Sequence, residues 1–202
     1  MASFTEQANL IFAQAVADYH RTDNVNTIMP NPFEEGTIEY DLYRKNWIDT
    51  VQWHLEDIIR DPSINPIEAL SLKRRIDHSN QERTDLVERI DSYFMECYRD
   101  VQPQSDARIN TESPAWAIDR LSILHVKLWH MREQVERKDV SAEQHAKCTA
   151  KLTVLEEQLN DMTISISQLL ADYQTGKRIM KVYRQMKMYN DPTLNPVLYS
   201  KK

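Results

Sequence analysis

The chain has 202 residues, of which 41% are hydrophobic, and its formal net charge at pH 7 is −6. This length and apolar content suit one globular domain, so a single helical domain over residues 1–202 is expected. Only two glycines, Gly36 and Gly176, are present, which excludes the glycine-rich phosphate loops of Rossmann and P-loop proteins.

In chain order, the first predicted helix covers residues 4–21, where apolar side chains recur on one face. The second covers residues 37–60 and ends before Pro62, because proline disfavours helical geometry in the residue that precedes it. The third begins at Asn65, a helix-capping residue that is followed by proline, and continues to about residue 99.

The fourth predicted helix runs from Pro114, which follows a serine cap, to about Lys138. Ser141 and Gln144 then form a capping-box pattern for the fifth helix. Along residues 145–173 of that helix, mostly apolar side chains alternate in steps of three and four, as they do in a coiled coil. This seam is filled either from within the bundle or by a second subunit, so the pattern leaves formation of a homo-oligomer open.

The C-terminal end is basic. Residues 177–202 contain seven Lys or Arg residues and one acid, whereas residues 1–176 contain 18 basic and 30 acidic residues. We expect a basic helix, KRIMKVYRQMKMY, followed by an irregular tail. This end either docks on an acidic partner, RNA or a phosphate, or folds back on the acidic bundle. No nucleic-acid-binding motif is present, so nucleic acid is not an expected partner.

The predicted fold class is therefore all-α, a bundle of about five long helices plus a short basic C-terminal helix. No apolar run is long enough to span a membrane, and the N-terminus does not resemble a signal peptide, which predicts a cytoplasmic protein. Cys97 and Cys148 lie among apolar residues at helical spacing. We expect two buried thiols and no disulfide.

Polar side chains interrupt the apolar faces of the second, third and fourth helices. Arg83 falls at the centre of the apolar arc of the third helix, with Asn80 beside it. It needs a carboxylate, phosphate or carbonyl partner, because burial of an unpaired charge is costly. His54 and Asp57 lie one turn apart on the second helix. These positions predict a buried or cleft-lining polar layer.

The fourth helix adds two further pairs to this layer. His125 and Arg132 lie in or beside its main apolar arc, whereas His130 and Glu133 share another side. The layer is either a hydrogen-bond network that fixes the register of the helices or the lining of a ligand site. In a ligand site, histidine and carboxylate pairs would have shifted pKa values, and Arg83 would hold an anion.

If the layer is a site, its residues divide by chemistry. The catalytic candidates, which are acid or base groups, are His54, Asp57, His125 and His130. The ligand-binding candidates are Asn80, Arg83 and Arg132. The metal-ligand candidates are His54, Asp57, His130 and Glu133. The sequence identifies no cofactor and leaves open whether the protein is an enzyme.

Four phrases stand out along the chain: WHLEDIIRDP at 53–62, RRIDxxNQxR at 74–83, HMREQ at 130–134 and KMYNDP at 187–192. Together they resemble a domain-of-unknown-function family of bacterial proteins, mainly from Bacteroidetes, of about this length. The resemblance covers most of the chain, from about residue 5 to residue 199. It implies no activity, and the association of such genes with lipopolysaccharide glycosyltransferase genes implies an envelope-glycan context.

Three functions remain open at this point. The first is a binding protein whose polar layer or basic end recognises an anionic ligand or partner. The second is a magnesium-dependent, all-α nucleotide pyrophosphohydrolase, for which two ExxD pairs, Glu82/Asp85 and Glu88/Asp91, are present but the upstream ExxE is missing. The third is a di-metal carboxylate bundle, although ferritin-like proteins place the glutamate before the histidine.

Overall fold

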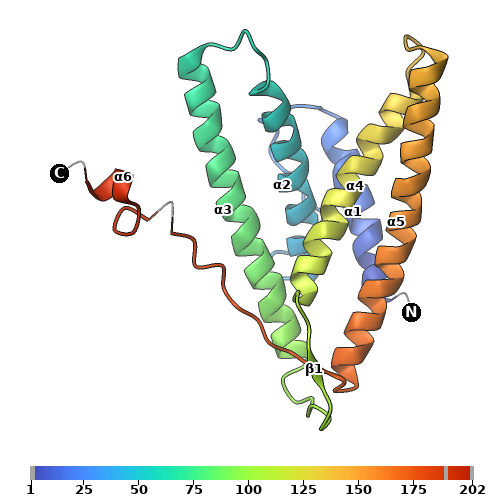
Figure 1. Cartoon of the computed structure of the whole chain (residues 1–202), viewed down its shortest axis with the longest axis vertical. Coiled ribbons are helices and arrows are strands. Elements are labelled where there is room, and N and C mark those ends of the chain that lie inside the picture. The colour runs from blue at the N-terminus through green and yellow to red at the C-terminus, as the bar shows by residue number, and fades with distance from the viewer. Residues whose placement is uncertain (1–2, 189–190, 201–202) are drawn as a thin grey trace.

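The computed structural model describes residues 3–188 and 191–200 and is dominated by helices (Figure 1). The helices are α1 (Phe4–His20), α2 (Ile38–Ile58), α3 (Pro66–Cys97), α4 (Pro114–Glu136), α5 (Ala142–Gln174) and α6 (Pro196–Tyr199). Two short strands, β1 (Arg108–Ile109) and β2 (Arg178–Ile179), pair in parallel. The all-α class and the five long helices are confirmed.

The helices begin where capping residues are found. The Ser141 hydroxyl accepts a hydrogen bond from the backbone N–H of Gln144, and Asn65 caps α3 ahead of a proline in its first turn. Ser3 forms a complete capping box with Glu6 at the start of α1. Such caps satisfy backbone groups that have no partner inside the helix, and the sequence therefore fixes the helix ends locally.

The long helices form two hairpins. In Figure 1, α2–α3 and α4–α5 lie close together at the lower end and diverge toward the top, with α1 behind them. Helix α1 contacts α2, α4 and α5, so it holds the two hairpins together. None of the helices in the described part of the chain is both long enough and apolar enough to cross a membrane.

The core lies where α1 meets both hairpins. It consists of buried side chains from all five long helices, among them Ala8, Phe12, Tyr19, Leu42, Tyr43, Trp47, Val87, Ile90, Phe94, Ile118, Leu121, Ile166 and Leu170. The lower half of the α5 seam, including Ile166 and Tyr173, is filled from within the chain. Toward the start of α5, the seam residue His145 is exposed and Leu152 and Leu155 are only partly buried, so this half of the seam is only partly covered.

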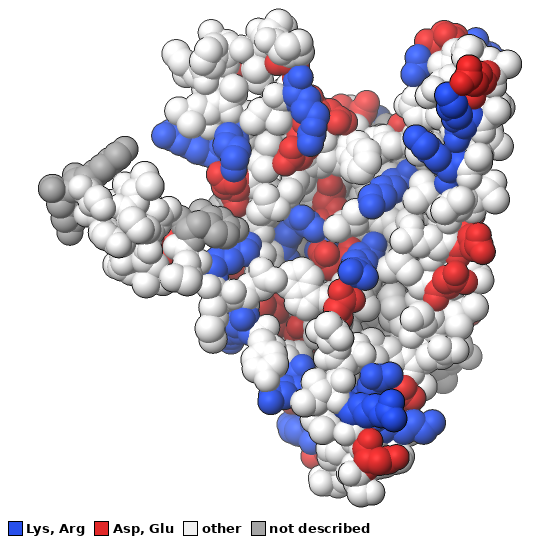
Figure 2. All heavy atoms as spheres, viewed as in Figure 1, with Lys and Arg blue, Asp and Glu red and all other residues white. Residues whose placement is uncertain are grey.

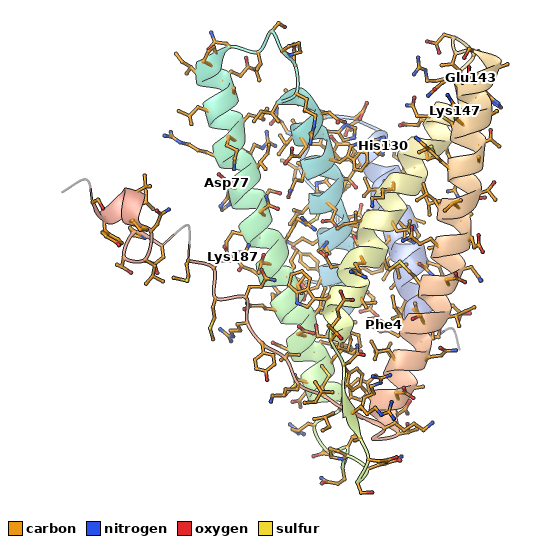
Figure 3. The ribbon with its side chains drawn as sticks, in the orientation of Figure 1. Phe4, Asp77, His130, Glu143, Lys147 and Lys187 are labelled. Atoms are coloured by element: carbon orange, nitrogen blue, oxygen red, sulfur yellow. The ribbon has the colours of Figure 1, made fainter. Side chains whose placement is uncertain are left out.

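The C-terminal segment differs from the prediction. Residues 177–188 are extended rather than helical, and the short helix, α6, follows later; residue 189 of the expected helix lies outside the described residues. The segment is held by tertiary contacts: β2 pairs with β1, and Lys187 donates to the backbone carbonyl of Asn80 on α3 (Figure 3). An isolated helix of this length would be marginal in water, which explains why these contacts prevail.

The expectation of two buried thiols is half correct. Both cysteines are free, and Cys148 is buried, but Cys97 is exposed. Cys97 is the last residue of α3, and its helical spacing continues the apolar face beyond the point where neighbouring helices still cover it.

Candidate functional site

A group of four charged side chains, three of them buried and one partly exposed, links α2, α3 and α4. Lys45 is fully buried, with its Nζ 2.8 Å from Asp119 Oδ1 and in contact with Asp49. Arg83 reaches the same carboxylates, with Nε 2.6 Å from Asp49 Oδ1 and Nη2 3.2 Å from Asp119 Oδ1. Two cations thus face two carboxylates, which is the compensation that buried charges require.

Of the three kinds of partner expected for Arg83, a carboxylate, a phosphate or a carbonyl, the structure provides carboxylates. Burial by itself would lower the pKa of Arg83, but the charges of Asp49 and Asp119 outweigh burial and raise that pKa. An anion that approached Arg83 would have to compete with these two carboxylates. The guanidinium is consequently a poorer anion clamp than the sequence alone suggests.

Hydroxyl and amide side chains surround the charged group. Ser122 Oγ donates to Asp49 Oδ2 at 2.6 Å, and Gln52 Nε2 donates to Asn80 Oδ1 at 2.9 Å, so α2 is bonded to both α3 and α4. We use the name polar layer for Lys45, Asn46, Asp49, Gln52, Ser79, Asn80, Arg83, Asp119 and Ser122. These hydrogen bonds and ion pairs form a network of the kind that fixes the register of three helices.

Cavities open beside the polar layer, and two of them are lined by Trp53. The arginine cavity, of about 360 Å³, is lined by residues that include Asp49, Gln52, Trp53, Asp57, Arg60 and Arg83. The apolar cavity, of about 770 Å³, is lined by residues of α2, α4 and α5 that include Trp53, Asp57, Lys127, His130, Lys151 and Leu155. Trp53 and Asp57 line both, so the cavities share one wall. Figure 2 shows a recess between the upper parts of the hairpins, with basic and acidic side chains inside it.

Three histidine rings meet behind this wall, at the junction of α1, α2 and α4. His20 Nε2 lies 3.3 Å from His54 Nε2. On the other side of its ring, His20 Nδ1 bonds the carbonyl of Val16 at 2.7 Å, and His130 Nδ1 bonds Glu133 Oε2 at 2.8 Å. His130 Nε2 is buried and has no hydrogen-bond partner. We call His20, His54 and His130 the histidine cluster.

Each ring of the histidine cluster is stacked against an aromatic side chain. Trp129 stacks on His20 at a centroid distance of 4.5 Å, Tyr19 on His54 at 5.0 Å, and Trp53 on His130 at 4.9 Å. Burial, together with the neighbouring His130 ring, lowers the pKa of His20 and of His54 below the ordinary value. These two imidazoles are therefore neutral near pH 7.

The comparisons with known proteins give one result. The family described as Protein of unknown function (DUF4254) matches residues 39–182 of the chain. The chain belongs to this family. The matched range includes the polar layer, two of the three clustered histidines and both cavities, whereas His20 precedes it. No curated protein and no solved structure matches the chain.

The structure of this DUF4254 protein separates the predicted site residues. Asn80 and Arg83 belong to the polar layer, and His54 and His130 belong to the histidine cluster. His125 lies elsewhere, where its Nε2 bonds Asn9 Oδ1 at 2.9 Å, and burial lowers its pKa to about 4. Arg132 is half exposed and pairs with Glu156 at 3.3 Å.

The predicted metal ligands are also divided. Among the described residues, the one group of three or more metal-binding side chains that converge within 4.8 Å is His20, His54 and His130. Glu133 bonds the far nitrogen of His130, and Asp57 lines the cavities. The expected histidines are thus brought together, but with a third histidine in place of the two carboxylates.

The carboxylates of the two ExxD pairs have separate partners. Glu82 pairs with Arg44, and Asp85 accepts from Gln81. Asp91 of α3 is buried against the start of α4, where it accepts from the Ser113 hydroxyl and the backbone N–H of Ala115. A magnesium site needs several oxygen ligands that converge, and these carboxylates do not supply it.

Sequence reasoning missed Lys45, Asp49 and His20. Lys45 and Asp49 follow the buried Leu42 at steps of three and seven, which places them on the same face of α2. That spacing was a usable signal for buried charge. His20 gave no comparable signal, because its partners are on α2 and α4 and the order of the helices cannot be read from the sequence.

Proposed function

We propose that this DUF4254 protein binds an anionic ligand that has an apolar body, with the apolar cavity as its site. The observation that carries the proposal is the combination of a mainly apolar lining with two lysines, Lys127 of α4 and Lys151 of α5. In the described part of the chain neither lysine forms an ion pair. The lining holds these two lysines against one carboxylate, Asp57, and an excess of positive charge beside an apolar wall favours an amphipathic anion.

The polar layer supports this site rather than forming its anion clamp. Arg83 is neutralised by Asp49 and Asp119, whereas Lys127 and Lys151 are exposed and free to bind. We assign to the polar layer the role of fixing α2 against α4, so that Trp53 is held at the wall that both cavities share. The envelope-glycan context implied by the resemblance agrees with this ligand class, since intermediates that carry a lipid and a phosphate are amphipathic anions.

Two fluorescent probes with the same aromatic body test the proposal. Anilinonaphthalene sulfonate carries a negative charge, whereas phenylnaphthylamine is neutral. We expect saturable binding of both, and we expect the Lys127→Gln/Lys151→Gln variant to bind the sulfonate about tenfold more weakly while it binds the neutral probe unchanged. The matched control is Lys147→Gln, because Lys147 lies on the same helix but pairs with Glu143 (Figure 3).

The proposal fails if the double variant binds the sulfonate as the unchanged protein does, or if neither probe binds saturably. A loss of both probes in the double variant would also contradict it, because the lysines would then shape the cavity rather than attract charge. Val154→Asp gives an independent check, since a carboxylate in the lining should weaken both probes and the sulfonate more strongly.

A further inference from the structure

We infer that His20, His54 and His130 bind one divalent transition-metal ion, for which zinc is the best match. The three imidazoles each offer a nitrogen, and these nitrogens all lie within 4.8 Å of one another. Two nitrogens bound to tetrahedral zinc at about 2.0–2.1 Å are about 3.3 Å apart. His20 Nε2 and His54 Nε2 are 3.3 Å apart in the structure, so the position between them fits an ion.

The hydrogen bonds on the far side of the rings orient the lone pairs correctly. His20 Nδ1–H donates to the carbonyl of Val16, and His130 Nδ1–H donates to the carboxylate of Glu133. Both Nε2 atoms are then left with a lone pair that faces the cluster. Metal-bound histidines commonly donate their second N–H to a carbonyl or carboxylate in this way.

His130 Nε2 is the atom that distinguishes a metal site from a simple packing cluster. In a packing cluster, His54 Nε2–H donates to His20 Nε2, and those two atoms are satisfied. His130 Nε2 would still be buried without a partner. Buried polar atoms are rarely left unpaired, and an ion held by all three nitrogens removes the deficit.

The surroundings suit an N-ligated ion. Trp129, Tyr19 and Trp53 each stack on one ring, which holds the imidazoles in fixed orientations. Three imidazole ligands favour zinc, cobalt, nickel or copper over magnesium or calcium. This preference separates the site from the magnesium chemistry of the pyrophosphohydrolase hypothesis.

Asp23 lies at the edge of the histidine cluster, beside His54. Asp23 Oδ1 lies 3.7 Å from His54 Nε2, and its side chain is 63% exposed. Asp23 has a left-handed backbone, with φ of 47°, and this conformation is tolerated by aspartate better than by most residues. Asp23 does not converge with all three nitrogens, so we assign the fourth position on the ion to water, as in zinc sites with three protein nitrogens.

Metal titration of tag-free protein, stripped with a chelator, tests the inference. We expect one equivalent of zinc to bind, and one equivalent of cobalt to give the intense visible spectrum of a four-coordinate ion that zinc then displaces. His20→Gln should lower zinc affinity by at least about a hundredfold, more than the ten- to hundredfold typical of groups that only orient a ligand, such as Glu133. His78→Gln is the matched control, because its side chain is 77% exposed and outside the cluster.

The cobalt spectrum keeps the test decisive if a histidine variant does not fold, since it reports the ligands of the unchanged protein. Absence of one-equivalent binding, an octahedral cobalt spectrum, or equal zinc affinity in His20→Gln and the unchanged protein would each overturn the inference. His20 does not line the apolar cavity, so folded His20→Gln should still bind anilinonaphthalene sulfonate. The proposal of a metal site and the proposal of a ligand site can therefore be disproved independently of each other.

Discussion

Lys45 is the residue whose burial is hardest to sustain. It is fully buried and lies between Asp49 and Asp119, which Arg83 also contacts. Lys45→Met removes one of two cations and leaves two carboxylates to share the other. We expect a loss of about 3–5 kcal/mol in the free energy of unfolding, measured by urea denaturation.

The matched control is Lys147→Met, which breaks an exposed ion pair with Glu143 and should change stability by no more than about 1 kcal/mol. Adding Asp119→Leu to Lys45→Met should recover much of the loss, because the remaining carboxylate and Arg83 then balance each other. A loss of under about 1 kcal/mol in Lys45→Met would show that the buried charges are not coupled as the distances indicate.

His125 predicts how stability depends on pH. Its pKa is lowered to about 4 by burial, whereas in the unfolded chain it is about 6.5. The unfolded state thus binds one more proton between these values, so stability is complete above pH 6.5 and falls as the pH drops toward 4. His125→Gln should remove up to about 1.4 kcal/mol per pH unit of this dependence in that window.

The measurement is the free energy of unfolding at several pH values, compared between His125→Gln and the unchanged protein. Burial also lowers the pKa of His20 and His54, so both proteins should lose stability in acid and the difference isolates His125. Parallel pH curves for the two proteins would contradict the assignment of a neutral, buried His125.

At the scale of single residues, the sequence predicts which buried positions are polar better than it predicts which side chains pair with them. The sequence places Arg83 in an apolar arc and predicts a carboxylate, phosphate or carbonyl partner, and the structure supplies the carboxylates of Asp49 and Asp119. Which carboxylates approach it, and that His20 meets His54 and His130, depends on how α1 and α2 pack on the other helices. Helical periodicity fixes the face of a residue but not the helix that covers that face.

At the scale of the elements, the long helices were predictable because their ends are set by local chemistry. Serine, asparagine and proline caps occupy neighbouring positions in the chain, and they act whatever the tertiary structure. The sequence predicts a helix over residues 177–189, whereas residues 177–188 are extended because β2 pairs with β1, which is distant in sequence. No local pattern of this segment reports that pairing.

Gly176 is the hinge from which this extended segment leaves α5. Its φ is +71°, and a Cβ at this position would lie 2.5 Å from the carbonyl oxygen of Gln102. The Gly176 carbonyl also accepts a 2.8 Å hydrogen bond from Gln104. Gly176→Ala should therefore cost more than the roughly 1–2 kcal/mol of left-handed backbone strain, and should loosen residues 177–188.

Thermal unfolding and limited trypsin digestion at Lys177, Arg178 and Lys181 measure these two effects. Gly36→Ala is the control, because Gly36 also has a positive φ, of +93°, but has nothing within 4 Å of an added Cβ. We expect a smaller loss of stability for Gly36→Ala and unchanged digestion of the C-terminal segment. Equal behaviour of the two variants would show that the contact with Gln102 does not hold the segment.

At the scale of the whole molecule, the described residues place their polar chemistry where α1 joins two diverging hairpins. The polar layer fixes α2 against α3 and α4, and the histidine cluster fixes the end of α1 against α2 and α4. The apolar cavity lies beside this junction, where α2 faces α4 and α5. An ion in the cluster would thus stabilise the same wall that a ligand in the cavity contacts.

Trp53 connects the two sites, and it predicts that metal and ligand bind cooperatively. Its ring stacks on His130 at 4.9 Å and also lines the apolar cavity. Zinc would further restrict the motion of His130 and hence of Trp53, so less of the binding free energy of the ligand would be lost in ordering that wall. We expect zinc to tighten binding of anilinonaphthalene sulfonate about fivefold, and the probe to tighten binding of zinc by the same factor, since coupling between two sites is reciprocal.

Titration of each ligand in the absence and presence of the other measures both factors. His78→Gln should retain the coupling, and His20→Gln, which leaves the cavity lining intact, should abolish it. Unequal factors would point to aggregation or a second site, and a factor of one in the unchanged protein would mean that Trp53 is already fixed without an ion.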